Sequence, residues 1–493
     1  MSAYQALHDR FKRIGALGGA EAILYWDMAT MMPPGGAESR AEQLAALQRV
    51  RHEILVAPET AELLARAEAE ALEPWPRANL REMRRLYREA AAVPPELLEA
   101  FTKACRRCEM QWREARLRSD FSAVRPALAE VLGLMTEVAQ ARGEALGLAP
   151  YDALLEHYQP GLRAARLEEL FGPLRAALPE LIEAVLDRQA TREPPLTPQV
   201  TVPLERQEAL ARRLMQRFGF PFDSGRLDSS LHPFSGGTPD DLRITTRWNE
   251  ADHGEALMGV LHETGHALYE AGLPKAWRLQ PVGEARGMAI HESQSLLLEM
   301  QVCRSLAFQR FLGPLLAEHF GADPAWEPEN LYRLATRVER GFIRVDADEV
   351  TYPAHVLLRA RLEPALLSGD LPLAELPGAW AEASRDLLGV VPPDDRQGCL
   401  QDIHWYDGAF GYFPTYSLGA MAAAQLYQAA LAAEPEIEEE IERGEIGRLL
   451  AWLRREIHGK GCLLEWEELI AQATGQPLEP SFYLAHLRRR YLE

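Results

Sequence analysis

Apolar residues recur every three or four positions through most of this chain, a spacing that places them on one face of a helix. The pattern predicts a mainly α-helical protein in which these apolar faces pack together. We expect helices over residues 36–54, 59–72, 95–117, 125–147, 166–189, 205–218, 295–321, 329–342, 353–367, 373–388 and 438–457.

Strand signals are few. The best candidates are residues 199–202 and 243–248, and the second follows a turn-rich segment at 235–240. A short sheet at this place would have an edge to which an extended peptide could add as a further strand. No internal repeat and no break in composition divides the chain. We therefore expect one large helical domain over residues 1–493, with a cleft between two lobes.

The composition and net charge of the chain exclude some classes of binding partner. The chain has 493 residues, 47% of them hydrophobic, so it can bury a large core. Its formal net charge of −20 makes nucleic acid and membrane surfaces unsuitable partners, because these bind basic patches. Five cysteines in so long a chain do not indicate a disulfide framework, and no apolar signal-peptide core follows Met1. These features predict a cytoplasmic protein.

Residues 408–433 contain no charged side chain, and a stretch of 26 residues is long enough to cross a bilayer. Gly411, Pro414 and Gly419 interrupt it, and several polar side chains accompany them. These interruptions argue against a membrane span. We predict a loop that leads into an Ala-rich helix buried inside the protein.

His262 and His266 lie four residues apart in a segment whose apolar neighbours predict a buried helix. This spacing places both imidazoles on one face, where a single metal ion can take both. Glu263 lies between them, placed to act on water at that metal. A buried cluster of this kind would leave polar groups unsatisfied without a metal, which disfavours an incidental pair of histidines. The Ala-rich helix, packed against this helix, would supply active-site hydroxyls.

A catalytic zinc ion takes three protein ligands and keeps one position for water, so a third ligand is required. One known continuation of the motif needs Gly at 269 and His at 272, whereas this chain has Tyr269 and Gly272. The third ligand must therefore come from a different element. On spacing alone the choice stays open among Glu284, His291, Glu292 and Glu299.

The metal motif is one of several segments that together resemble the M32 family of zinc carboxypeptidases, the thermostable carboxypeptidase Taq type. Six ordered motifs carry the resemblance, and residues 24–33 near the N-terminus add to it, so that it spans nearly the whole chain. The six are His232-Pro233-Phe234, 241–245 (DLRIT), 262–266 (HETGH), 291–294 (HESQ), 343–348 (IRVDAD) and 398–405 (GCLQDIHW).

The resemblance implies that Glu292 is the third ligand of one Zn²⁺ per chain, for which Co²⁺ can substitute in a site of two histidines and a glutamate. It implies a carboxypeptidase that releases single amino acids from the free C-terminus of peptides. It also implies a helical fold like that of neurolysin and angiotensin-converting enzyme, with a deep groove, a small sheet beside it and N-terminal helices partly covering it. A homodimer is expected on the same ground.

Peptide hydrolysis requires further groups. We expect Glu263 to accept a proton from water and to deliver it to the leaving amine. The oxyanion that develops on the scissile carbonyl needs a donor besides the metal. Tyr416 is the first candidate and Tyr412 the second, because similar residues face the metal in related helical zinc peptidases. His404 is a candidate for which a core role is equally open, and His232 is expected to donate to the substrate backbone.

Restriction to a free C-terminus requires a cation that binds the terminal carboxylate, and arginine does so with two parallel hydrogen bonds. Arg344 is the best candidate, held in place by Asp346 or Asp348, and a purely structural ion pair is the competing interpretation. Arg243 is the second candidate.

Two other functions are compatible with these patterns. Without a cation that closes the groove, the same metal chemistry would give an oligopeptidase or an aminopeptidase. With a vestigial metal site, the chain would be a helical binding or scaffold protein.

Overall fold

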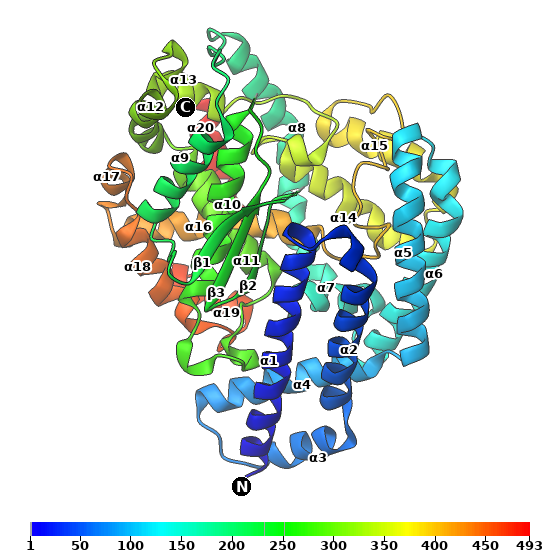
Figure 1. Ribbon diagram of the computed structural model, residues 1–493. Coiled ribbons are helices and arrows are strands. Elements are labelled where there is room, and N and C mark those ends of the chain that lie inside the picture. Colours follow the sequence, from blue (N-terminus) through cyan, green and yellow to red (C-terminus); the bar gives the residue numbers. More distant parts are fainter. Residues whose placement is uncertain (1, 231, 251) are drawn as a thin grey trace.

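The computed structural model describes residues 2–230, 232–250 and 252–493, and it confirms the mainly α-helical fold with a small sheet (Figure 1). In chain order the elements are α1 (Ala3–Thr30), α2 (Ala37–Val56), α3 (Pro58–Ala67), α4 (Pro74–Ala92), α5 (Pro95–Arg118), α6 (Phe121–Leu146), α7 (Pro150–Tyr158), α8 (Ala164–Ala190), α9 (Leu204–Arg217), β1 (Gly225–Ser229), β2 (Phe234–Thr238), β3 (Asp241–Thr246), α10 (His253–Gly272), α11 (Met288–Leu296), α12 (Leu306–Phe320), α13 (Pro328–Ala335), α14 (Tyr352–Ser368), α15 (Leu376–Leu388), α16 (Pro414–Ala433), α17 (Ile437–Glu442), α18 (Gly447–Glu456), α19 (Trp466–Thr474) and α20 (Pro480–Leu492).

The prediction of one continuous helix over 295–321 is wrong. Helix α11 continues into a π-helical segment, Leu297–Cys303, and the chain then breaks before α12. Ser305 caps the new helix, because its hydroxyl accepts a hydrogen bond from the Phe308 N–H at 3.1 Å. Neither glycine nor proline marks the break, so periodicity alone gave no sign of it.

Three further predicted helices end early or are divided, and the first of them, predicted over 59–72, ends at Ala67. The helix predicted over 329–342 ends at Ala335, since the backbone N–H and C=O of Val338 pair with the side-chain amide of Gln189 instead of with a helix. The helix predicted over 438–457 is split into α17 and α18. Gly444 takes a left-handed conformation between them, with φ of 75°.

The sheet has the order β1-β3-β2, with β1 parallel and β2 antiparallel to β3. Strand β3 overlaps the prediction at 243–248, although it begins two residues earlier and ends at Thr246, but the strand predicted at 199–202 is wrong. That segment belongs to no strand: the Val202 N–H donates to the carbonyl of Glu250, and the Gln199 N–H donates to the carboxylate of Asp323. Helix α10 packs against β2 and β3, and α1 packs against β2.

The uncharged stretch 408–433 forms a loop and the buried helix α16, as predicted. Its packing partner differs from the expectation, because α16 lies chiefly against α11 and not against α10. Gly419 permits this approach, since a Cβ there would lie 2.7 Å from Cγ of Glu292. Among the described residues, no helix combines the length and low polarity needed to cross a membrane.

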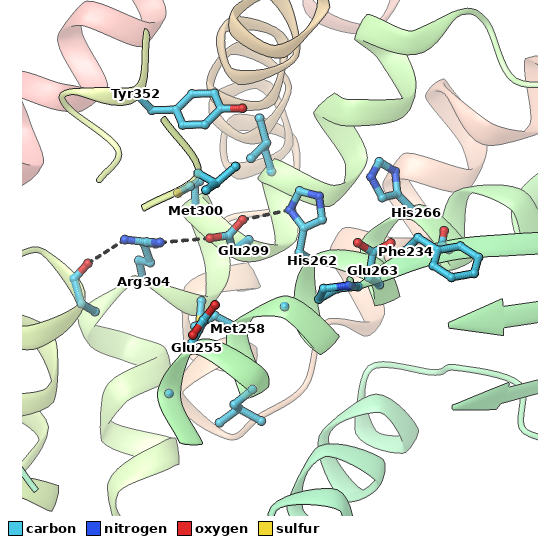
Figure 2. A pocket seen from close by; sticks show the side chains of 18 of the residues that line it. Phe234, Glu255, Met258, His262, Glu263, His266, Glu299, Met300, Arg304 and Tyr352 are labelled. Atoms are coloured by element: carbon cyan, nitrogen blue, oxygen red, sulfur yellow. Dashed lines mark hydrogen bonds and ion pairs between the residues drawn. The ribbon is translucent and has the colours of Figure 1, made fainter. Parts of the chain in front are cut away.

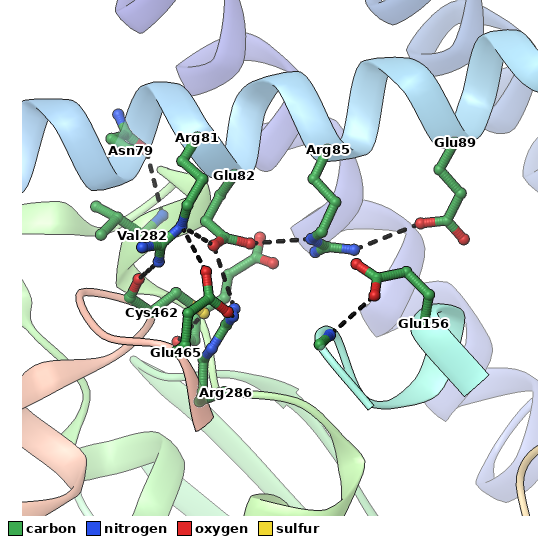
Figure 3. Close-up of polar contacts among 12 residues, drawn as sticks. Asn79, Arg81, Glu82, Arg85, Glu89, Glu156, Val282, Arg286, Cys462 and Glu465 are labelled. Atoms are coloured by element: carbon green, nitrogen blue, oxygen red, sulfur yellow. Dashed lines mark hydrogen bonds and ion pairs between the residues drawn. The ribbon is translucent and has the colours of Figure 1, made fainter. Parts of the chain in front are cut away.

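Buried ion pairs tie the N-terminal helices to the rest of the chain (Figure 3). Glu82 on α4 accepts a hydrogen bond from Arg286 Nη1 at 3.2 Å, and both side chains are almost fully buried. Arg85 also donates to Glu82, at 3.0 Å, and Glu465 near the C-terminal end pairs with Arg286. These contacts join α4, the loop before α11 and the loop before α19 in one body.

We expect Glu82→Ala to destabilise the protein by about 3–5 kcal/mol, because it removes the buried carboxylate partner of Arg286 and leaves the partly exposed Glu465. Denaturant unfolding followed by circular dichroism measures this loss. Glu99→Ala is the control, since Glu99 pairs with Lys103 on an exposed face of α5 and its removal should leave the transition unchanged. Equal losses of unfolding free energy in the two variants would contradict the stabilising role assigned to the Glu82–Arg286 pair.

Candidate active site

A cavity of about 1460 Å³ lies between the sheet and the helices. Strand β2 borders it along its whole length, and α10, α11, the π-helical segment, α13 and the segment around Arg344 contribute the other walls. Strand β2 is an edge strand of the sheet, and its residues line the cavity. The expectation that N-terminal helices partly cover this groove stays a prediction.

Helix α10 presents the predicted motif to this cavity. Asp252 caps its N-terminus by accepting a hydrogen bond from the Glu255 N–H at 3.0 Å. His262 and His266 follow one turn apart, and both line the cavity (Figure 2). A Cβ at Gly265 would lie 2.5 Å from the carbonyl oxygen of Gln294. Glycine at this position therefore allows α11 to approach α10 closely.

This approach brings a third potential ligand to the two histidines. Oε2 of Glu292 lies 3.9 Å from Nε2 of His262 and 3.5 Å from Nε2 of His266. The three residues can place one ligand atom each within 4.8 Å of one another. Spacing left the third ligand undecided, and the geometry favours Glu292.

Glu299 and His291, which spacing also allowed as metal ligands, lie behind the two histidines. His262 donates from Nδ1 to Oε2 of Glu299 at 2.9 Å, and Arg304 donates to the second carboxylate oxygen of Glu299 at 3.0 Å (Figure 2). Nδ1 of His266 lies 2.6 Å from Nδ1 of His291. Both Nδ1 atoms are engaged, which leaves both Nε2 atoms facing Glu292.

The pKa values of His262 and His266 are shifted in opposite directions. Burial alone would lower the pKa of His262, but the hydrogen bond to Glu299 and the nearby carboxylates raise it to about 10. Burial lowers the pKa of His266 to about 4. Without a metal, His262 is therefore protonated at neutral pH and His266 is not.

Glu263 points into the same cavity from the turn between the histidines, and 8% of it is exposed (Figure 2). Burial raises the pKa of Glu263 to about 7, although the positive charge on His262 acts against the shift. A carboxyl group with a pKa near 7 can both accept and return a proton at neutral pH.

Tyr412 and Tyr416 also line the cavity, with ring centroids 5.2 Å apart. Burial raises the pKa of Tyr412 to about 12 and that of Tyr416 well above its ordinary value, so both remain protonated donors. His404 lies behind them, with Nε2 3.3 Å from the Tyr416 hydroxyl, and does not itself line the cavity. Burial lowers its pKa to about 4, which keeps the imidazole neutral.

Arg344 lines the cavity, but its predicted partners are wrong. Neither Asp346 nor Asp348 holds it: Asp402 accepts hydrogen bonds from its Nε at 3.1 Å and its Nη2 at 2.8 Å. Asp348 instead accepts hydrogen bonds from backbone N–H groups of its own loop and from Glu339. The correct partner is distant in sequence, so local pattern could not identify it.

Tyr352 was not identified from the sequence, although it lines the cavity and accepts a hydrogen bond from Arg344 Nη1 at 2.7 Å. Arg304 and Glu270 were also missed; Glu270 lies 2.9 Å from Nε2 of His291. Tyr352 and Arg304 belong to no spaced pattern of metal-binding residues, whereas Glu270 follows His266 by four positions on the same helix, a spacing that could have identified it.

Two predicted residues are not brought to the metal cluster. Arg243 pairs with Asp241 at 2.8 Å and lies over the Trp26 ring at 4.4 Å, outside the cavity lining formed by the described residues. His232 is exposed, and its carbonyl accepts a hydrogen bond from the Ser230 hydroxyl at 2.6 Å. A substrate-binding role for either side chain stays a prediction.

Comparisons with known proteins agree with this geometry. The family model described as carboxypeptidase Taq (M32) metallopeptidase matches residues 6–491. The chain is 39% identical to the thermostable carboxypeptidase 1 of Thermus thermophilus, over 99% of this chain and 98% of the relative. It is 35% identical to the protein of the same name from Pyrococcus furiosus, over 98% and 97% of the two chains. The solved structure of metallocarboxypeptidase 1 from Trypanosoma cruzi superposes with a TM-score of 0.98 at 42% identity, covering 100% of this chain and 99% of that one.

Proposed function

The chain belongs to the carboxypeptidase Taq (M32) family of metallopeptidases and is a metallocarboxypeptidase, and we propose that it uses Zn²⁺ to release single amino acids from the free C-terminus of peptides. The observation that carries the proposal is the arrangement of His262, His266 and Glu292 beside Glu263, in one cavity with Arg344.

The donor set fits the metal. Two imidazole nitrogens and one carboxylate oxygen are the ligands of many catalytic zinc sites, and cobalt accepts the same set. When bound there, the ion supplies a Lewis acid that acidifies water and polarises a peptide carbonyl. His262, His266 and Glu292 would hold it.

Glu263 would act as the general base and then as the general acid. Its buried carboxylate accepts a proton from the attacking water and returns it to the leaving amine. The Tyr416 hydroxyl, or in its place that of Tyr412, would donate to the developing oxyanion. His404 would act through Tyr416, because the Tyr416 hydroxyl lies between it and the cavity.

The walls of the groove suggest how the peptide lies. An extended peptide could add to the free side of β2, which bounds the cavity. Arg344 would bind the terminal carboxylate. Of its five N–H groups, three donate to Asp402 and Tyr352, so two remain for a ligand.

We expect zinc uptake to release about one proton at pH 7, because His262, with a pKa near 10, must lose its proton before Nε2 can bind metal. His266 is already neutral and contributes none. The affinity should therefore rise with pH through the neutral range. Isothermal titration calorimetry in buffers of different ionisation enthalpy counts the protons. A count of zero would contradict the assigned charge of His262.

A cytoplasmic homodimer is part of the proposal. All five cysteines are buried and unpaired, as a reducing compartment permits. The dimer rests on the family resemblance alone, and sedimentation equilibrium would test it.

Paired substrates test the restriction to a free C-terminus. We expect the zinc-loaded protein to cleave an N-acetylated dipeptide and to leave its C-terminally amidated form intact, because Arg344 recognises a carboxylate. Equal cleavage of both compounds would overturn the restriction and favour an oligopeptidase.

A further inference from the structure

At the end of the π-helical segment Leu297–Cys303, the last four backbone carbonyl groups accept hydrogen bonds from side chains elsewhere in the chain. A helix end leaves such carbonyls without partners inside the helix, and π-helical turns are frequently found at functional sites. Ser305 donates to the carbonyl of Val302, and Gln309 Nε2 donates to that of Cys303 at 2.6 Å. These two donors come from the next few residues of the chain.

The carbonyls of Met300 and Gln301 depend on the C-terminal helix. Arg490 on α20 donates from Nη1 to the carbonyl of Met300 and from Nη2 to that of Gln301, at 3.3 Å. The contact joins residues 189 and 190 positions apart in sequence. One guanidinium thus spans both carbonyls at the end of the segment.

Buried groups hold Arg490 in this place. Glu349 accepts a hydrogen bond from Arg490 Nη1 at 2.9 Å and another from the Tyr491 hydroxyl at 2.9 Å. His486 Nε2 lies 2.7 Å from Glu349 and 3.2 Å from the side-chain amide of Gln301. The side chains of Arg490 and Glu349 are 8% and 2% exposed, so water does not compete for these bonds.

The segment that Arg490 holds also carries Glu299, the carboxylate that accepts the Nδ1 hydrogen of His262 (Figure 2). Arg304, directly after the segment, binds the second carboxylate oxygen of Glu299. A carboxylate behind a metal-binding histidine fixes the orientation of the ring and raises its basicity. Movement of the segment would therefore move the support of His262.

We propose that the C-terminal helix α20 is a remote brace of the metal site: Arg490, held by Glu349, fixes the end of the π-helical segment, and the segment fixes Glu299 against His262. Arg490 is a positioning residue that touches neither substrate nor metal. The inference rests on the proposed metal site.

The test measures the zinc affinity of the full-length protein by competition with a chromophoric chelator, at a temperature where each metal-free variant is folded by circular dichroism. Arg490→Gln should weaken zinc binding about tenfold, the lower end of the effect of losing a residue that supports a metal ligand. Saturating zinc should restore kcat, because every group that acts on the substrate is still present. Arg488→Gln is the matched control, since it removes the same charge from an exposed position of the same helix and should bind zinc normally.

A second variant decides the question if Arg490→Gln does not fold. Arg490→Lys keeps a positive charge beside Glu349 but has no planar fork to span the carbonyls of Met300 and Gln301, so zinc binding should again weaken. If each of these two variants that folds binds zinc as tightly as the unaltered protein, the bracing role is overturned. Failure of the unaltered protein to bind zinc or cobalt would instead overturn the proposed function, so the two failures are distinguishable.

Discussion

Replacing Glu263 with Gln should lower kcat by about 10²–10⁴-fold while the protein retains its metal. Glutamine keeps the shape of the side chain but cannot accept a proton from water. The metal cluster is formed by other residues, so zinc content should stay at one per chain. Steady-state kinetics combined with elemental analysis of the same sample measures both quantities.

The control for this variant is Glu318→Gln, on α12. Glu318 is exposed, pairs with Arg213 and lies outside the cavity lining formed by the described residues, so its loss should leave kcat close to that of the unaltered protein. Peptidase activity retained in Glu263→Gln at full zinc occupancy would rule out Glu263 as the general base.

Arg344→Ala should lower kcat/KM by roughly 30- to 1000-fold, the effect of about 2–4 kcal/mol that follows removal of one partner of a buried charge pair. The loss should appear mainly as a higher KM, since the terminal carboxylate is bound in both the ground state and the transition state. The fold should survive, because Asp402 keeps its hydrogen bond to Arg359 Nε at 2.7 Å. Kinetics on a dipeptide with a free C-terminus measures the change.

Two further variants sharpen this prediction. Arg344→Lys should restore little activity, because a point charge does not reproduce the planar fork of a guanidinium. Arg243→Gln should leave KM unchanged, since that side chain lies outside the cavity lining. A rise in KM for Arg243→Gln with normal kinetics for Arg344→Ala would reverse the assignment of the two arginines.

Periodicity and spacing were sufficient for the features that depend on local sequence. Most helices are present at their predicted positions, and the HETGH motif lies on a buried helix as its apolar neighbours indicated. These properties follow from residues close together in the chain.

Periodicity and spacing could not predict the features that depend on contacts between segments distant in sequence. Asp402 holds Arg344 from 58 residues away, and no spacing rule connects them. Spacing identified Glu299 and His291 as possible ligands, but only the packing of α11 on α10 places them behind the histidines. Strand β2 is short and contains two glycines, so it carried no strand signal although it borders the cavity.

The most direct test of the central claim is to incubate the zinc-loaded protein with an unblocked peptide and to read the products by mass spectrometry. We expect a series of fragments that share the original N-terminus and shorten one residue at a time from the C-terminal end, and no products after the metal is removed. Fragments that have lost N-terminal residues, or an intact peptide in the presence of fully zinc-loaded protein, would contradict the claim.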